Sequence, residues 1–171
     1  MKVEPAALLR GHVRVPGDKS ISHRAVLLGL VGEGETRIAG FGRSADTEST
    51  LAAVRSLGVD IYEADDDTLR VFGAGLRGLR APPGPIDCGN AGTLMRLLPG
   101  ILAGQEGRFE LTGDVSLSAR PMERVAEPLR QMGVAIETID GHGPLTIQGG
   151  PVKPITYELP VASAQVKSAV L

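Results

Sequence analysis

The same order of apolar and polar positions occurs twice along the chain, which indicates an internal repeat. Leu57–Ile61 (LGVDI) is similar to Met132–Ile136 (MGVAI), and Arg37–Gly40 (RIAG) is similar to Glu110–Gly113 (ELTG). The matching segments are separated by a nearly constant distance of roughly 75 residues, as expected for a repeated structural unit. Period-two alternation predicts strands, and three- to four-residue spacing predicts helices. Each unit therefore reads as strand, helix, strand, helix, strand, strand.

The first unit contains the best-defined helix of the chain. Its apolar residues Leu51, Val54 and Leu57 share one face, and Gly58 follows as a C-terminal stop signal. The acidic run Asp65–Asp67 is typical of a solvated turn between two strands. The predicted elements are a strand at Gly11–Val15, helices at Ser20–Val31 and Ser44–Leu57, and strands at Glu35–Ala39, Val59–Glu63 and Thr68–Phe72.

The second unit repeats this pattern with two prolines in one of its helices. Pro121 is expected at the first helical position, where proline is tolerated, and Pro128 is expected to kink or break the helix. The predicted elements are helices at Ala91–Leu102 and Pro121–Met132, and strands at Arg108–Thr112, Val134–Thr138 and Leu145–Gln148.

A third unit begins near the end of the chain. A strand is predicted at Ile155–Leu159 and a helix from about Ser163. The chain ends at Leu171, about two turns into that apolar helix, with no cap and no polar tail. We therefore expect a fragment whose third unit is truncated.

Composition narrows the classes of function. The 171 residues suit one domain or slightly more, with 42% apolar residues, 22% charged residues and a net charge of −2. A mildly acidic chain is a poor candidate for nucleic-acid binding, which needs a basic surface. The longest apolar stretches, such as Ala25–Val31, are too short to span a bilayer, and Met1–Arg10 lacks the apolar region of a signal peptide. A single cysteine excludes an intrachain disulfide and fits a reducing cytosol.

Two familiar types of cofactor site are not supported. Gly73–Gly78 (GAGLRG) matches the dinucleotide-binding fingerprint, but the prolines that follow it cannot open the helix that this motif requires. His12, His23 and His142 have no metal-ligand spacing with one another or with Cys88. We expect neither a metal nor a cofactor.

Three predicted helix starts share a composition that suits anion binding. Pro16–Ser20, Asp87–Thr93 and Val161–Gln165 each supply small residues and hydrogen-bonding side chains. The first N–H groups of a helix have no internal partner, and the helix dipole places positive charge there. Small residues allow an oxyanion to approach those donors. Lys19 adds a mobile full charge. The three helix starts are predicted to face one shared cleft.

Basic side chains accompany two of these helix starts. Arg24 lies four residues after Ser20, and Arg96 lies four residues after Gly92, so each pair shares a helix face. Arg120 is placed before a predicted helix, where its guanidinium can grip a carboxylate or a phosphate.

A plainer reading of the same residues also exists. Ser20, Asn90 and Ser163 are good N-cap types, and any one of them alone is more often a cap than part of a ligand site. Arg96 has the alternative of an ion pair with a neighbour such as Asp87.

Four segments together resemble the signatures of the EPSP synthase (3-phosphoshikimate 1-carboxyvinyltransferase) family. The resemblance runs in order from about Gly11 to the last residue. Its segments are Val15–Arg24 (VPGDKSISHR), Asp87–Arg96 (DCGNAGTLMR), Gly113–Met122 (GDVSLSARPM) and Leu159–Leu171 (LPVASAQVKSAVL).

The resemblance implies an α/β fold and an activity. The family has two domains of repeated βαβαββ units, an inside-out α/β barrel, with substrates between the domains. Its members transfer the enolpyruvyl group of phosphoenolpyruvate to the 5-hydroxyl of shikimate 3-phosphate and release phosphate, in the shikimate pathway to aromatic amino acids. Residues 1–17 would then be a strand segment of the other domain and the crossover, and residues 18–171 most of one repeat domain. A monomeric cytoplasmic enzyme without metal or cofactor is implied.

The resemblance also implies roles for individual residues. Lys19 would be catalytic and would touch both substrates. Shikimate 3-phosphate binding is implied for Lys19, Ser20, Arg24, Ser163, Ala164 and Gln165. Phosphoenolpyruvate binding is implied for Lys19, Asn90, Gly92, Arg120 and Gln165. Ala164 replaces a second serine of many members, and Leu97 replaces a proline found in some. Gly92 leaves room where glyphosate-tolerant members carry alanine, which implies a glyphosate-sensitive enzyme.

Further family residues would lie beyond Leu171, namely an Asp, a Glu and a cluster of Lys and Arg, so no turnover is expected from this chain alone. The sister enolpyruvyl transferase that acts on UDP-N-acetylglucosamine remains an alternative, although it typically has Asn at the position of Ser20. A non-catalytic anion-binding module is a second alternative.

Overall fold

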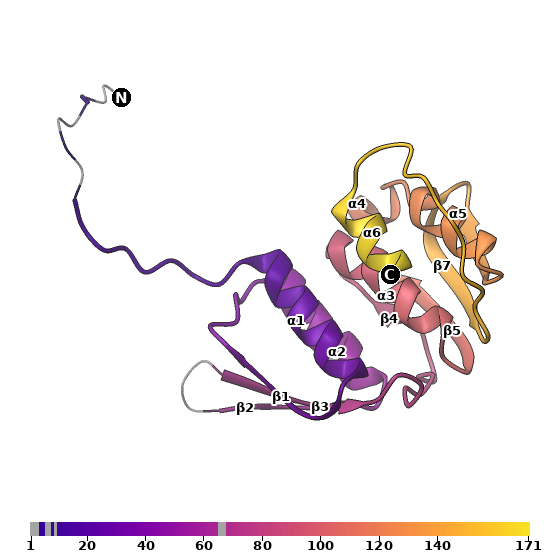
Figure 1. Ribbon diagram of the computed structural model, residues 1–171, viewed down its shortest axis with the longest axis horizontal. Helices are drawn as coiled ribbons and strands as arrows, with labels where there is room; N and C mark the ends of the chain where they lie inside the picture. The colour runs from indigo at the N-terminus through magenta and orange to yellow at the C-terminus, as the bar shows by residue number, and fades with distance from the viewer. Residues whose placement is uncertain (1–3, 6–7, 9, 65–67) are drawn as a thin grey trace.

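The computed structural model describes residues 4, 5, 8, 10–64 and 68–171, which form two α/β units that lie side by side (Figure 1). The first unit carries an antiparallel sheet with the order β1-β3-β2. Its strands are β1 (Glu33–Ala39), β2 (Asp60–Glu63) and β3 (Thr68–Ala74), and its helices are α1 (Lys19–Val31) and α2 (Ala45–Ser56).

The second unit has the sheet order β4-β5-β7-β6, with β4 parallel to β5 and the other pairs antiparallel. Its strands are β4 (Ile86–Asp87), β5 (Gly107–Thr112), β6 (Ala135–Ile139) and β7 (His142–Gly149). Its helices are α3 (Gly92–Ala103), α4 (Val115–Ser118) and α5 (Glu123–Gln131), and α6 (Ala164–Val170) follows at the end of the chain. The order β1-β3-β2 of the first sheet therefore recurs as β5-β7-β6, and the predicted α/β class is confirmed.

Local chemistry fixes where the helices begin. The Asp18 side chain caps α1 by accepting from the Ile21 N–H at 2.8 Å. Ser44 and Thr47 form a capping box at the start of α2. Ser20 lies inside α1, and the N-cap of α3 is the residue after Asn90 and makes no side-chain cap bond, so the cap reading of Ser20 and Asn90 is wrong.

The cap reading of Ser163 is confirmed, because its hydroxyl accepts from the Val166 N–H at 3.3 Å at the start of α6.

Two predicted strands are not formed. Gly11–Val15 is exposed and extends away from the body of the molecule (Figure 1), and Ile155–Leu159 crosses the second unit without strand pairing. Alternation favours a strand only where a neighbouring strand can satisfy the backbone N–H and C=O groups, and neither segment has one among the described residues. The predicted turn at Asp65–Asp67 lies outside the described residues.

The prolines of α5 differ from expectation. The helix begins at Glu123 after its N-cap Met122, so Pro121 precedes the helix and is not its first residue. Pro128 lies inside α5, which continues to Gln131 without a break. Burial of the face around Leu129 stabilises this short helix against the loss of one backbone hydrogen bond.

The core joins both units. α1 packs against β3, and α3 packs against β5, β7, α1 and α6. Hydrogen bonds of Arg24 join α1 to α6. One cluster of buried apolar residues runs through both units, and Leu30, Leu98 and Phe109 are among its largest fully buried members. This packing fixes the starts of α1, α3 and α6 relative to one another. Within the described residues, no helix has the length and apolar character needed to cross a membrane.

Candidate functional site

The first turn of α1 presents two of the predicted residues to solvent. Lys19 keeps 53% of its side chain exposed and pairs with Asp46, with 2.7 Å between Nζ and the Oδ2 atom. Ser20 is exposed beside it. The ammonium group is therefore held at the surface by a carboxylate from α2, which the sequence did not reveal as a partner.

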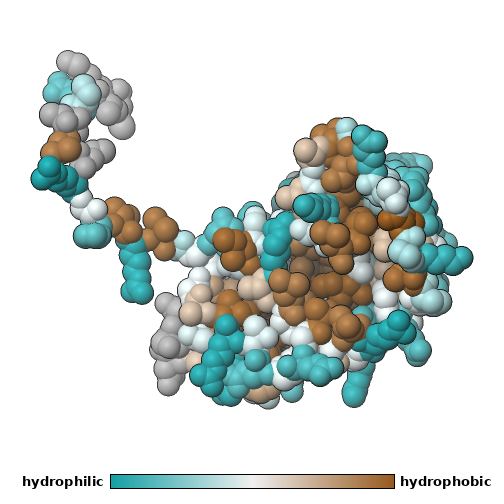
Figure 2. Space-filling model, viewed as in Figure 1, coloured by the Kyte–Doolittle hydropathy of each residue, from teal (hydrophilic) through white to brown (hydrophobic). Residues whose placement is uncertain are grey.

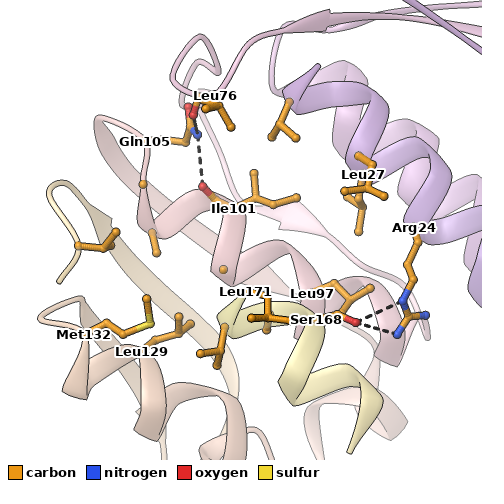
Figure 3. A pocket seen from close by; sticks show the side chains of 18 residues that line it. Arg24, Leu27, Leu76, Leu97, Ile101, Gln105, Leu129, Met132, Ser168 and Leu171 are labelled. Carbon is orange, nitrogen blue, oxygen red and sulfur yellow. Dashed lines mark hydrogen bonds between the residues drawn. The ribbon is translucent and has the colours of Figure 1, made fainter. Parts of the chain in front are cut away.

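Arg24 joins α1 to α6. Its Nη2 donates to the Ser168 hydroxyl at 3.1 Å (Figure 3). Nη2 also donates to the Ala164 carbonyl at 3.5 Å, and Nη1 donates to the Ser20 carbonyl at 3.2 Å. In Figure 1 the chain enters α1 and α6 from the same side of the molecule. Three predicted residues, Ser20, Arg24 and Ala164, are thus brought together.

Gln165 joins α6 to α3. Its Oε1 accepts from Arg96 Nη1 at 3.3 Å, and its Nε2 donates to the Thr93 hydroxyl at 3.2 Å. Arg96 is buried and also donates to the Pro121 carbonyl at 3.4 Å. No ion pair joins Arg96 to Asp87 in the described part of the chain, so that alternative is wrong.

Gly92 lies against two guanidinium groups at the start of α3. A Cβ atom placed on Gly92 would be 2.9 Å from Arg120 Nη1 and 3.0 Å from Arg96 Nη1. Only a hydrogen fits between the helix start and these two cations. The small residue therefore permits the close approach of two positive charges to the start of α3.

Asn90 connects Arg120 to an acidic residue. Arg120 Nη2 donates to the amide oxygen of Asn90, and the Asn90 Nδ2 atom donates to both carboxylate oxygens of Asp114, at 3.0 and 2.8 Å. Asp114 was not among the predicted residues. Its signal in the sequence is its place as the N-cap of α4 directly before a short helix.

The arginines of the site retain unneutralised charge. Within the described residues, Arg24, Arg96 and Arg120 have no carboxylate at ion-pair distance. Burial lowers the pKa of Arg96 to about 10, with a further contribution from repulsion by Arg124 and Arg120. Arg96 still stays protonated at neutral pH, and an arriving anion would relieve this repulsion.

Two cavities lie near these residues, and neither encloses them all. A cavity of about 620 Å³ between α1, α3 and α6 is mainly apolar, with Arg24 and Ser168 at one end (Figure 3). Figure 2 shows apolar side chains gathered in the hollow between the two units. A cavity of about 370 Å³ is lined by Arg124 and Ser163, among others.

Lys19, Asn90 and Gly92 line neither of these two cavities. Hydrogen bonds link predicted donors into a chain of contacts from Ser20 and Arg24 through Ala164 and Gln165 to Arg96, and a separate hydrogen bond joins Arg120 to Asn90. Its members range from exposed, as Ser20 is, to buried, as Arg96 is. The described residues contain no cluster of three His, Cys, Asp or Glu side chains that could hold a metal ion. What the arrangement offers chemically is a set of fixed cations, amides and hydroxyls suited to an anion.

Comparison with known proteins agrees with this chemistry. Residues 3–171 match the family model described as EPSP synthase (3-phosphoshikimate 1-carboxyvinyltransferase). The chain is 59% identical over 171 residues to the 3-phosphoshikimate 1-carboxyvinyltransferase of Alkalilimnicola ehrlichii, a match that covers 99% of this chain and 38% of that protein. The corresponding protein of Salinibacter ruber is 52% identical over 172 residues, with 99% and 40% covered.

The fold agrees as well. A solved structure of EPSP synthase from Acinetobacter baumannii superimposes with a TM-score of 0.90 at 48% sequence identity, covering 94% of this chain and 37% of that one. The chain thus spans about two fifths of the length of the curated relatives that it matches. On the sequence match over nearly its whole length, the chain belongs to the EPSP synthase (3-phosphoshikimate 1-carboxyvinyltransferase) family.

Proposed function

We propose that this chain supplies part of the site in which the enolpyruvyl group of phosphoenolpyruvate is transferred to the 5-hydroxyl of shikimate 3-phosphate, with release of phosphate. The observation that carries the proposal is the position of the guanidinium groups of Arg96 and Arg120, which border the space where a Cβ atom on Gly92 would lie and are not ion-paired within the described residues. Both substrates are anions, and such a cluster offers them charge-assisted hydrogen bonds.

The two substrates are assigned to neighbouring parts of the contact chain. Shikimate 3-phosphate would lie at the starts of α1 and α6, against Lys19, Ser20, Arg24, Ser163, Ala164 and Gln165. Phosphoenolpyruvate would lie at the start of α3, against Lys19, Asn90, Gly92, Arg120 and Gln165. Hydrogen bonds support a junction at Gln165, which is on α6 beside Ala164 and bonds to Arg96 and Thr93 on α3.

The proposed chemistry is an addition followed by an elimination. The 5-hydroxyl oxygen loses its proton and forms a bond to the enol carbon that carries the phosphate, the methylene carbon gains a proton, and a tetrahedral intermediate results. The bond from that carbon to the phosphate oxygen then breaks, phosphate leaves and a methyl proton is lost. Fixed cations favour the charge that develops on the leaving phosphate, and holding two substrates in register lowers the entropy cost. Lys19 is the proposed catalytic residue because its mobile ammonium can reach both anions.

The complete architecture proposed for the enzyme is the inside-out α/β barrel with two domains. Residues 1–17 would belong to the other domain and the crossover, and residues 18–171 would form most of one domain. The exposed, unpaired state of Gly11–Val15 supports this division, because the segment has no sheet partner among the described residues. The complete enzyme is proposed to be a monomer of the cytoplasm.

A chimera tests the proposed function. This chain replaces the matched segment of the Alkalilimnicola ehrlichii relative, and phosphate release is measured with phosphoenolpyruvate and shikimate 3-phosphate. We expect turnover from the chimera and none from the 171-residue chain alone. Turnover by the chain alone, or an inactive but folded chimera, would contradict the proposal.

A matched pair of variants keeps the chimera test specific. Arg120→Met should raise the KM for phosphoenolpyruvate at least about tenfold, since it removes a charged hydrogen-bond donor. Arg108→Met removes an exposed arginine from β5, outside the proposed site, and should leave both KM values within about twofold. Equal effects of the two variants would indicate a nonspecific role for positive charge.

A further inference from the structure

Asp114 occupies a junction between the loop before α3 and the short helix α4. Its backbone N–H donates to the Gly89 carbonyl at 2.8 Å, and its Oδ1 accepts from the Leu117 N–H at 2.7 Å. The carboxylate is therefore fixed in orientation by the backbone on both sides.

The fixed carboxylate dictates the orientation of the Asn90 amide. Both oxygens of Asp114 accept from Asn90 Nδ2, at 3.0 and 2.8 Å. A carboxylate only accepts hydrogen bonds, so the NH₂ side of the amide must face it. The carbonyl oxygen of Asn90 must then point the other way.

The outward-facing carbonyl of Asn90 meets Arg120. Arg120 Nη2 donates to this oxygen, while the Arg120 backbone N–H donates to the Leu117 carbonyl at 3.0 Å. Asn90 thus holds the guanidinium of Arg120, and Leu117 holds its backbone. Asp114 hydrogen-bonds directly to both of these residues. Within the part of the chain that the structure describes, no carboxylate lies at ion-pair distance from this guanidinium, so its charge remains available.

We infer that Asp114 is a positioning residue: through the amide of Asn90, it holds the Arg120 guanidinium beside Gly92 without neutralising it. The inference rests on the proposed function, because Arg120 is a proposed ligand of phosphoenolpyruvate. The hydrogen bond from Asn90 also lowers the pKa of Asp114, together with the bond from the Leu117 N–H, so the carboxylate stays ionised over the neutral range.

A purely structural role for Asp114 would be that of a helix cap for α4. Serine caps helices about as well as aspartate but cannot offer two acceptor oxygens to the Asn90 amide. Asp114→Ser therefore separates the two roles. The matched control is Ser44→Ala, which removes the N-cap of α2, where Ser44 bonds to Thr47 and not to the residues of the proposed site among the described residues.

The first readout is the NMR signature of the Arg120 side chain in the 171-residue chain. In the unchanged protein, the Arg120 Nη protons should be resolved and slow to exchange, because they are hydrogen-bonded. Asp114→Ser should lose this signature and Ser44→Ala should keep it. The exchanged pair Asn90→Asp with Asp114→Asn should regain it, because donor and acceptor are only reversed between the two positions.

The second readout is phosphoenolpyruvate binding, followed by the same resonances. Asp114→Ser should weaken binding roughly tenfold, as expected for the loss of one charge-assisted hydrogen bond, and Ser44→Ala should stay within about twofold. If Asp114→Ser does not fold, Asp114→Asn is used, since asparagine is an equally good cap and should show the same losses.

An unchanged Arg120 signature in the folded Asp114 variant, or an equal loss in Ser44→Ala, would overturn the inference. Absence of phosphoenolpyruvate binding by the unchanged protein would instead count against the proposed function. The signature test needs no substrate, so the two failures are distinguishable.

Discussion

Gly92 is the residue with the least room in the proposed site. Its Cα hydrogen faces two guanidinium groups, and an added methyl carbon would come within 3.0 Å of both. The ends of arginine side chains are flexible, so they can yield with little loss of stability. Their displacement would nevertheless move the positive charge away from the start of α3.

Gly92→Ala should therefore affect binding more than folding. In the chimera, we expect a higher KM for phosphoenolpyruvate and a concentration of glyphosate for half-inhibition that rises roughly ten- to a hundredfold, because displacement of a binding group by a fraction of an ångström is costly. Thermal unfolding should change little.

Steady-state inhibition curves of the chimera and its Gly92→Ala variant check this expectation. A curve for the unchanged chimera that stays flat into the millimolar range would contradict the sensitivity that the glycine implies.

His23 gives the protein a pH-dependent stability. Its ring is fully buried, Nδ1 is 2.6 Å from the Thr50 hydroxyl, and Nε2 has no partner among the described residues. Burial lowers the pKa of His23 below its ordinary value of 6.5, Asp46 acts in the opposite direction, and Lys19 and Arg24 add to the lowering. The folded protein thus binds this proton less readily than the unfolded chain does.

The free energy of unfolding should consequently fall as the pH drops below about 6.5, with a slope of at most about 1.4 kcal/mol per pH unit from this residue. His23→Asn should flatten that slope, because asparagine keeps a polar atom near Nδ1 without the titration. His12→Asn, in the exposed segment before α1, is the control and should retain the slope. Urea unfolding between pH 5 and 7 measures it, and equal slopes in all three proteins would exclude His23 as the cause.

At the residue scale, the sequence pointed to most of the candidate site but not to its internal order. Family motifs selected Arg24, Asn90 and Arg120, and hydrogen bonds join each of them to other predicted residues. Asp114 and Ser168 were missed because a cap residue and a helix-surface serine have no distinctive pattern. Their importance arises only when segments distant in the chain meet.

Among the elements, helices were better predicted than strands. The periodic pattern and stop glycine of α2 placed its ends within one residue of those observed. Strands at Gly11–Val15 and Ile155–Leu159 failed, because a strand depends on a partner that local sequence does not encode. The continuation of α5 past Pro128 was not predicted either, because it depends on tertiary packing, which helix propensities do not include.

The position of α6 depends on one glycine of α3. A Cβ atom on Gly100 would lie 1.9 Å from the Ala169 carbonyl oxygen and 3.0 Å from the Ala169 Cα. These are backbone atoms, so Gly100→Ala should force α6 away from α3 and cost about 2 kcal/mol, as overpacking commonly does. Gln165 would then separate from Arg96.

Amide hydrogen exchange along α6 measures this displacement. Gly100→Ala should lose protection there, while Gly104→Ala, whose nearest neighbour would be 3.9 Å away, should not. Equal protection in both variants would show that α6 does not rely on this close approach.

On the scale of the whole molecule, α6 lies between Arg24 of α1 and Arg96 of α3 and hydrogen-bonds to both, which concentrates cations where the two units meet. The net charge of −2 hides this local concentration, which is why composition alone excluded classes of partner but did not identify a ligand. The chain spans about two fifths of the length of its curated relatives.

The most direct test of this account is a titration of the isotope-labelled chain with shikimate 3-phosphate, read at the backbone amides of Ser20, Thr93 and Gln165. We predict that the three amides shift together with a single dissociation constant, and that UDP-N-acetylglucosamine produces no comparable shift. Three unrelated saturation curves, or equal shifts with the UDP sugar, would contradict a shared site for shikimate 3-phosphate at these helix starts.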